Sequence, residues 1–146
     1  MPPYFDLYVL ARERSAAVAN HFLDAFVPDR DQSAADYGFP KYASQLEVVL
    51  KSAAEAIQYC ESHPVETQSI YFRNLGTDPA HAMLFFTSDG GLILGLSVLG
   101  RQDEWFGRLK EYARSEVGYI TFESPPAATV AEFRQLAARA YDTDAT

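Results

Sequence analysis

The sequence predicts an α+β fold: a mainly antiparallel sheet of five to six strands, packed by about four helices, in a single domain of 146 residues. Its clearest sign is the segment 82–98, where two apolar runs flank Asp89-Gly90-Gly91, a sequence typical of a tight β-hairpin turn. Strand-like and helix-like segments alternate on both sides of it. Because both hairpin strands are apolar on two faces, we expect this hairpin at the centre of the sheet.

The first predicted strand is residues 4–10, in which Phe5, Leu7 and Val9 alternate with more polar residues, as in a β-strand. A helix to about residue 26 follows, because Ser15 is a favourable N-cap and apolar residues then recur at helical spacing. Pro28 ends this helix.

Residues 28–45 form a long predicted loop, because Gly38 and Pro40 interrupt any long regular element. Connections of this length in a compact domain are often functional. One interpretation is a partner-binding surface, since the loop mixes acids with aromatic rings. Its candidate binding residues are Asp29, Asp31, Asp36, Tyr37 and Tyr42, with Glu47 and Asp78 nearby in the sequence. The other interpretation is a loop that packs its aromatic rings over the edge of the sheet.

Two interpretations fit residues 46–60. One long helix would place the apolar residues on one side. Alternatively, a short strand over 46–50 precedes a helix, because Val48 and Val49 favour a strand and Ser52 begins a capping box with Glu55. We favour the strand followed by the helix. In either case Cys60 lies on the apolar side, as a small buried side chain.

The remaining elements follow from the same signals. Residues 68–74 form a strand before the central hairpin, and residues 118–123 form the last strand. Between the hairpin and the last strand, Asp103 is expected to cap a helix over 104–114. Thr129 begins a second capping box, which opens a C-terminal helix.

One face of the predicted sheet is less apolar than the other. Tyr71 and Arg73 point to this face, while their strand neighbours point to the core. Gly95 and Ser97 on the hairpin leave space above the same face. That space is compatible with a shallow pocket, with a groove for a partner, or with a helix that packs closely.

Net charge is −8, with acidic residues spread along the whole chain. Such a domain repels a phosphate backbone and an anionic membrane, so we predict no nucleic-acid or membrane partner. The acidity is compatible with a basic protein partner, and equally with a surface whose charge serves only solubility. No signal peptide or membrane-spanning segment is expected, and the single cysteine cannot form an intrachain disulfide. These features predict a cytoplasmic protein.

Catalytic and metal-binding motifs are not found in the sequence. The three histidines lie far apart, and no Gly-rich phosphate loop or serine hydrolase motif is present. Asp6, Asp89 and Glu123 lie at predicted strand ends, where an active site could gather carboxylates, but no pattern in the sequence shows that they converge. We therefore predict no catalytic residue, no metal site and no cofactor.

Four segments resemble those of small acidic bacterial proteins similar to the immunity proteins of polymorphic toxin systems. They are residues 70–75 (IYFRNL), 82–87 (AMLFFT), 89–98 (DGGLILGLSV) and 118–123 (GYITFE). The resemblance covers about residues 46–135. It implies a non-catalytic protein that binds a cognate toxin domain and blocks its active site. A toxin domain that is basic would suit the acidic surface.

Two further functions stay open at this stage. The first is a small-molecule-binding or enzymatic domain whose site lies around Tyr71 and Arg73, with Met83 or Phe85 beside them. The guanidinium group of Arg73 could then pair with a carboxylate or phosphate. The second is a homo-oligomer that buries the apolar part of this face between two copies.

Overall fold

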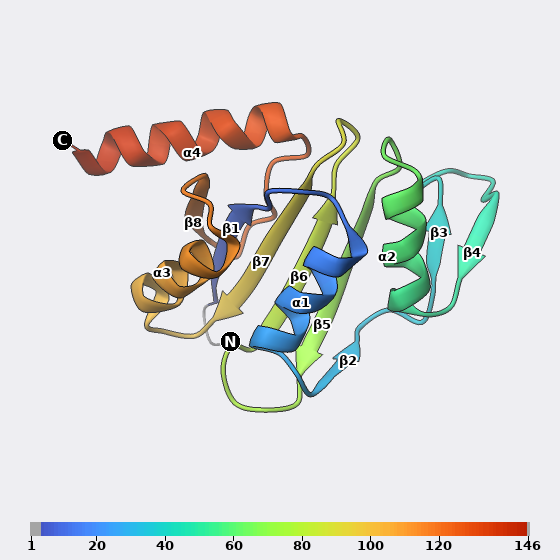
Figure 1. Ribbon diagram of the computed structural model, residues 1–146, viewed down its shortest axis with the longest axis horizontal. Coiled ribbons are helices and arrows are strands. Elements are labelled where there is room, and N and C mark those ends of the chain that lie inside the picture. Colours follow the sequence, from blue (N-terminus) through green and yellow to red (C-terminus); the bar gives the residue numbers. More distant parts are fainter. Residues whose placement is uncertain (1–3, 146) are drawn as a thin grey trace.

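The computed structural model describes residues 4–145, with side chains as far as Ala140, and confirms the predicted α+β fold (Figure 1). Six strands form one antiparallel sheet in the order β2-β5-β6-β7-β1-β8, and two form a separate antiparallel pair, β3-β4. The hairpin β6-β7 is central, as predicted. The strands are β1 (Phe5–Leu10), β2 (Arg30–Gln32), β3 (Tyr37–Phe39), β4 (Val48–Leu50), β5 (Gln68–Asn74), β6 (His81–Phe86), β7 (Leu92–Val98) and β8 (Gly118–Phe122).

Helices cover the two faces of the sheet unequally. The four over the described residues are α1 (Ala16–Phe26), α2 (Ala53–Ser62), α3 (Gln102–Ala113) and α4 (Val130–Ala145). Helices α1, α2 and α3 contribute to the core on one face, whereas α4 alone packs on the other (Figure 1). None of these helices has the length and apolar composition needed to cross a bilayer.

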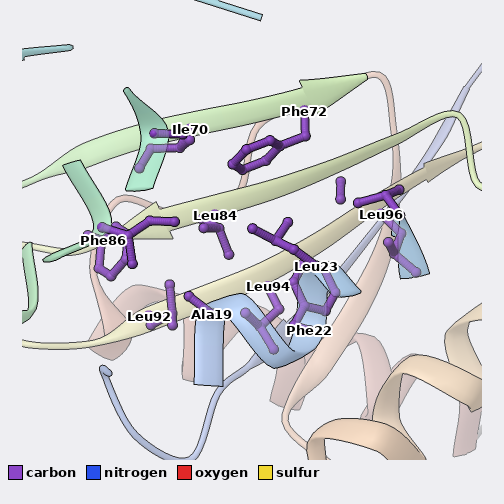
Figure 2. Close-up of a cluster of buried hydrophobic side chains, with 14 of the residues drawn as sticks. Ala19, Phe22, Leu23, Ile70, Phe72, Leu84, Phe86, Leu92, Leu94 and Leu96 are labelled. Carbon is purple, nitrogen blue, oxygen red and sulfur yellow. The ribbon is translucent and has the colours of Figure 1, made fainter. Parts of the chain in front are cut away.

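The larger core lies between α1 and the central strands. Phe22 and Leu23 of α1 point toward the sheet, against Leu84 of β6 and Leu94 of β7, and all four side chains are essentially inaccessible to solvent (Figure 2). Each such side chain contributes about 1.5–3 kcal/mol through burial. Cys60 of α2 belongs to the same core, as predicted, and burial raises its pKa to about 12.

Three of the predicted helix caps are confirmed. In each, a side-chain oxygen accepts a hydrogen bond from a backbone N–H three residues later: Ser15 from Val18 at 3.1 Å, Ser52 from Glu55 at 3.1 Å, and Thr129 from Glu132 at 3.2 Å. The strand followed by a helix is also confirmed for 46–60, as β4 and α2. Short local signals therefore determine where these helices begin.

The predicted Asp103 cap is wrong. Helix α3 begins two residues earlier than predicted, at Gln102 after Arg101, whose backbone is left-handed with φ of 55° and whose side chain caps no N–H group. The Arg101 guanidinium instead donates to the Glu104 carboxylate at 2.7 Å. Asp103 and Glu104 lie in the first turn, where their negative charge interacts favourably with the positive end of the helix dipole.

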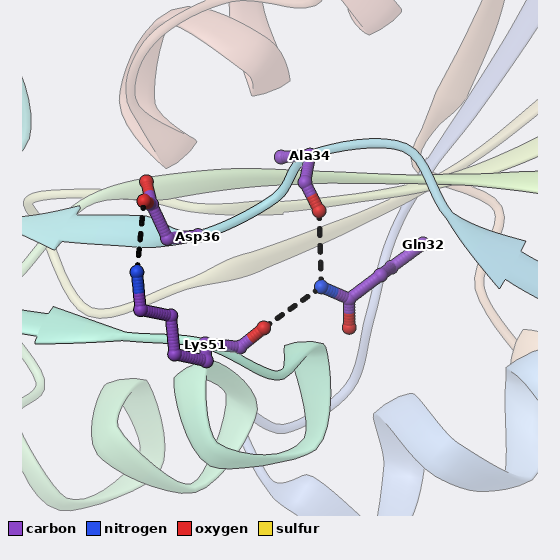
Figure 3. Close-up of polar contacts among 4 residues, drawn as sticks. All are labelled: Gln32, Ala34, Asp36 and Lys51. Atoms are coloured by element: carbon purple, nitrogen blue, oxygen red, sulfur yellow. Dashed lines mark hydrogen bonds and ion pairs between the residues drawn. The ribbon is translucent and has the colours of Figure 1, made fainter.

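The segment 28–45 contains two short strands, β2 and β3. Gln32 at the end of β2 donates hydrogen bonds to the carbonyl groups of Ala34 at 3.0 Å and of Lys51 at 2.9 Å (Figure 3). Its Oε1 atom accepts from the backbone N–H of Ala53 at 2.8 Å. One amide side chain thus joins β2 to the first turn of α2 and keeps this segment against the domain.

The β6-β7 turn also holds the N-terminus of α4. The carboxylate of Asp89 accepts hydrogen bonds from the backbone N–H groups of Val130 at 2.9 Å and Ala131 at 3.2 Å. Partial desolvation by itself raises the pKa of Asp89. Hydrogen bonds from Val130, Thr87 and Ala131 outweigh it and hold the pKa below its usual value. Asp89 is therefore a second cap for α4, supplied from a distant turn.

Replacing Asp89 by alanine is expected to lower the free energy of unfolding by about 1 kcal/mol at neutral pH. A depressed carboxyl pKa stabilises the fold above the unfolded value of 3.8, and that contribution is lost as pH falls through the folded-state pKa. Urea unfolding at about pH 7 and about pH 2 measures both values. Ser88→Ala, in the same exposed turn, is the control. If Asp89→Ala lowers the free energy of unfolding by the same amount at both pH values, that result contradicts a charged cap.

Candidate functional site

A broad hollow lies on the sheet face opposite α1, beyond the part that α4 covers. Its volume is about 630 Å³, and we call it the sheet-face hollow. Strands β1, β5, β6 and β7 form its floor, and the chain after β8 forms one wall. It is lined by Tyr4, Asp6, Tyr8, Ser33, Tyr71, His81, Met83, Ser97, Glu123, Ser124 and Pro125.

Strand register places a row of polar side chains across this face. Each of the six strands of the main sheet contributes one residue to this row. Each of these residues is the register partner of the row residue on the neighbouring strand. Such neighbours on one face have Cβ atoms about 4.5–5.5 Å apart. In sheet order the row is Asp31, Arg73, His81, Ser97, Asp6 and Thr121.

Asp6 is the most buried charged group of this row, at 8% exposure. Its Oδ1 atom accepts a hydrogen bond from the Ser97 hydroxyl at 2.8 Å, and its Oδ2 atom accepts from the backbone N–H of Ser124 at 3.0 Å. Burial raises the pKa of Asp6, and the negative charge of Glu123 adds to the increase. The two hydrogen bonds and His81 act in the opposite direction without cancelling it.

Three tyrosine rings line the sheet-face hollow together with Asp6. The hydroxyl of Tyr8 donates to the carbonyl of Ser124 at 2.6 Å, which holds its ring across the floor. Tyr71 meets Phe85 edge-to-face at 5.7 Å between ring centroids, and Tyr4 meets His81 in the same way at 5.6 Å. Each of these rings is fixed by a partner.

The space expected above Gly95 is occupied. A Cβ atom on Gly95 would lie 3.0 Å from the ring of Tyr8 and 3.1 Å from the terminal methyl of Met83. The missing side chain therefore lets Tyr8 and Met83 lie flat against the sheet. The hollow opens above these two side chains and not at Gly95.

The structure brings four of the predicted binding residues to this side of the sheet. Tyr71 lines the sheet-face hollow and is 42% exposed. It also lines a smaller adjoining pocket of about 290 Å³, together with Tyr42, which is 91% exposed. Arg73 lies at the end of the polar row, where its guanidinium pairs with the Asp31 carboxylate at 3.0 Å.

The other three predicted binding residues do not join them. Tyr37 is a core residue at 3% exposure, so it cannot anchor a partner at the surface, and its buried hydroxyl has no hydrogen-bond partner among the described residues. Asp36 pairs with Lys51 at 3.5 Å, beside the two-stranded sheet (Figure 3). Asp29 is exposed before β2. The acidic segment is therefore not one coherent surface.

Asp6, Asp89 and Glu123 were predicted to lie at strand ends, and no pattern in the sequence indicated that they converge. Asp6 and Glu123 line the same hollow, whereas Asp89 lies at the opposite end of the sheet, under α4. Ser97 and His81 were not predicted as parts of a site. Within the described part of the chain, no three His, Cys, Asp or Glu side chains converge as metal ligands.

A second hollow of about 580 Å³ lies between α1 and α3. Its charged side chains are all exposed, so each keeps its water shell. The charged groups of this second hollow are Arg12, Glu13, His21 and Arg114. We therefore place the candidate site at the sheet-face hollow.

The sheet-face hollow is suited to a cationic group. Both oxygens of Asp6 keep a free lone pair after their one hydrogen bond each. No Lys or Arg side chain among the described residues forms a salt bridge with Asp6, and a buried carboxylate without a cation is costly. Tyrosine faces attract ammonium and guanidinium groups as well.

Comparison of the chain with protein-family models, with curated proteins and with solved structures finds no match.

Proposed function

We propose that this is a non-catalytic binding protein whose sheet-face hollow receives a cationic side chain of a basic partner protein. The observation that carries the proposal is Asp6: a carboxylate at 8% exposure, on the floor of an open hollow, with no salt-bridge partner among the described residues. A lysine or arginine side chain would supply the missing charge. Its hydrogen atoms would meet the remaining lone pairs of Asp6.

Several features favour a protein over a small ion as the partner. The rim of the hollow carries exposed Tyr71 and exposed Glu123, and Tyr42 stands beside it in the adjoining pocket. Tyrosine is enriched in the centres of protein interfaces. The net charge of −8 would steer a basic protein toward this surface and accelerate association.

An immunity protein is the specific form of this proposal. Such a protein acts by covering the active site of a toxin domain, so it needs an acidic and aromatic surface and no catalytic residues. The resemblance noted for residues 70–75 and 118–123 concerns β5 and β8. Tyr71 of β5 and Glu123, directly after β8, line the hollow from opposite sides.

Affinity capture from the native host tests this function. The wild-type protein is expected to retain one dominant basic protein, and the double variant Tyr71→Ala/Glu123→Gln is expected to retain at least tenfold less. Both side chains are exposed, so the fold should be unaffected. The control is Val65→Ala/Glu47→Gln, which removes an exposed apolar side chain and an exposed acid away from the hollow. Equal capture by the two double variants, or no basic protein at all, contradicts the proposal.

One observation favours a second candidate, a small-molecule site. The volume of about 630 Å³ lies within the range of small-ligand pockets, roughly 300–1,000 Å³. The negative charge of the Asp6 carboxylate would then favour a ligand with an amine or guanidine group. A thermal shift screen with arginine, agmatine and tetramethylammonium tests this. Saturable stabilisation by one of them, lost in Tyr71→Ala, together with no captured protein, would favour the small ligand.

A further inference from the structure

The sheet has an unpaired edge at β8. Within the part of the chain that the structure describes, β8 pairs with β1 on one side and with no strand on the other. An open edge presents backbone N–H and C=O groups that a further strand can pair with. The opposite edge, β2, has three residues, two of which are the charged Arg30 and Asp31.

Register identifies which groups of β8 point outward. The backbone N–H of Leu10 donates to the carbonyl of Val117, and that of Glu123 donates to the carbonyl of Tyr4. Antiparallel strands alternate between hydrogen-bonded and non-hydrogen-bonded pairs, so the odd-numbered residues of β8 bond to β1. The outward N–H and C=O groups therefore belong to Gly118, Ile120 and Phe122.

A trough runs along this edge. Its volume is about 900 Å³, and its floor includes Gly118 and Ile120 of β8. Helices α3 and α4 form its two walls, because they pack on opposite faces of the sheet at β8 (Figure 1). The wall residues Gly107, Ala137 and Ala140 are small, and a Cβ atom on Gly107 would meet nothing within 4 Å. This leaves room for a backbone to approach β8.

The devices that commonly protect edge strands are missing from β8. Its sequence GYITF contains no lysine, no proline and no charged residue, and its pairing with β1 is continuous without a bulge. Phe122, at the end of the strand, is 55% exposed. An apolar edge of five residues, matched to a trough, is suited to an extended chain.

We propose that β8 binds an extended, positively charged segment of another protein as a seventh strand of the sheet. This surface is separate from the sheet-face hollow, and the proposal does not depend on the function assigned to that hollow. Charge selects the occupant. A second copy would bring a further net charge of −8, whereas the acids Asp103 and Glu116 outnumber Lys110, the one cation among the trough's lining residues, and favour a basic segment. Strand addition supplies affinity through the backbone and selectivity through alternate side chains.

A nine-residue peptide of alternating lysine and valine is the probe. We expect its addition to ¹⁵N-labelled protein to shift the amide signals of Gly118, Ile120 and Phe122 more than those of Tyr119 and Thr121. The same peptide N-methylated at alternate residues on one edge should bind at least tenfold more weakly, because it cannot form the ladder. Shifts located elsewhere, or equal binding by both peptides, would overturn the proposal.

Proline variants test the edge from the protein side. Phe122→Pro removes an outward N–H group, so the peptide should bind at least tenfold more weakly than to Phe122→Ala, which keeps it. Ile120→Pro and Ile120→Ala repeat the comparison at the centre of the strand. Equal affinity of the proline and alanine variants would overturn the proposal. So would a β8-mediated dimer of the free protein at micromolar concentration, seen by analytical ultracentrifugation, since a second copy would then occupy the edge.

Discussion

Arg14→Ala is expected to lower the free energy of unfolding by about 4 kcal/mol, the largest effect of any single substitution proposed for this protein. The guanidinium of Arg14 donates to five backbone carbonyl groups. They belong to Cys60 at 3.0 Å, His63 at 3.0 Å, Glu66 at 2.6 Å, Thr87 at 2.7 Å and Gly91 at 3.2 Å.

The position of Arg14 explains the size of this effect. It precedes α1, yet it joins the end of α2 and the following loop to both sides of the β6-β7 turn. Its guanidinium also lies over the ring of Phe86, 5.1 Å from the centroid. Burial lowers its pKa, with the nearby Cys60 and Glu66 groups opposing the shift. Removing it takes one donor from each of the five carbonyl groups, of which those of His63, Thr87 and Gly91 keep a backbone N–H partner.

Urea unfolding of Arg14→Ala and Arg14→Lys measures this contribution. Lysine has three donors on one atom and cannot reach five carbonyl groups, so about 2 kcal/mol of the loss should remain in Arg14→Lys. Arg12→Ala, an exposed arginine two residues earlier, should change stability by less than about 0.5 kcal/mol. A loss below about 1 kcal/mol for Arg14→Ala would show that water replaces its hydrogen bonds.

Asp6→Asn is expected to abolish binding of a cationic partner while keeping the fold. Asparagine can satisfy the same two neighbours, since its Oδ1 atom accepts from the Ser124 N–H and its amide donates to the Ser97 hydroxyl, which can also accept. The free energy of unfolding at neutral pH should stay within about 0.5 kcal/mol of wild type or exceed it, because a buried charge is removed. Binding should fall at least a hundredfold.

The pH dependence of stability provides the second readout for Asp6. Burial raises its folded-state pKa above the unfolded value of 3.8. The folded state therefore holds the proton more tightly, and this group increases the free energy of unfolding as pH falls through its folded-state pKa, until pH reaches the unfolded value. The increase should be absent from Asp6→Asn. Identical pH profiles of stability for the wild type and Asp6→Asn would contradict a raised pKa of Asp6. Asp6→Ala should be less stable than Asp6→Asn, because it leaves the Ser124 N–H without its acceptor.

Local signals were sufficient for most of the fold. Ser15 and Ser52 cap their helices in the structure because a cap depends on residues three positions apart. Asp103 failed as a cap because Arg101 adopts a left-handed backbone that starts α3 early. Strands β2 and β3 have three residues each, too short to show a period of two.

The site was harder to predict because it depends on register between distant strands. Asp6 and Ser97 are hydrogen-bonded across 91 residues, and no local pattern contains that pairing. Tyr71 was predicted to face this side because its direction follows from strand alternation alone. The role of Arg14 had no sequence signal, since all five of its acceptors are backbone carbonyl groups, which every residue carries.

The place of β1 between β7 and β8 has a consequence for biosynthesis. Phe5 pairs with Val98 on one side and with Phe122 on the other, so both neighbours of β1 are translated long after it. At roughly 5–20 residues per second, β1 leaves the ribosome about 5–20 s before it can be paired on both sides. Leu7 and Val9, fully buried in the finished sheet, lie on a strand that lacks its β8 neighbour for that time. Of the strands in this sheet, β1 is translated first and its partner β8 last. We therefore expect chaperones that hold short apolar segments to bind the nascent chain.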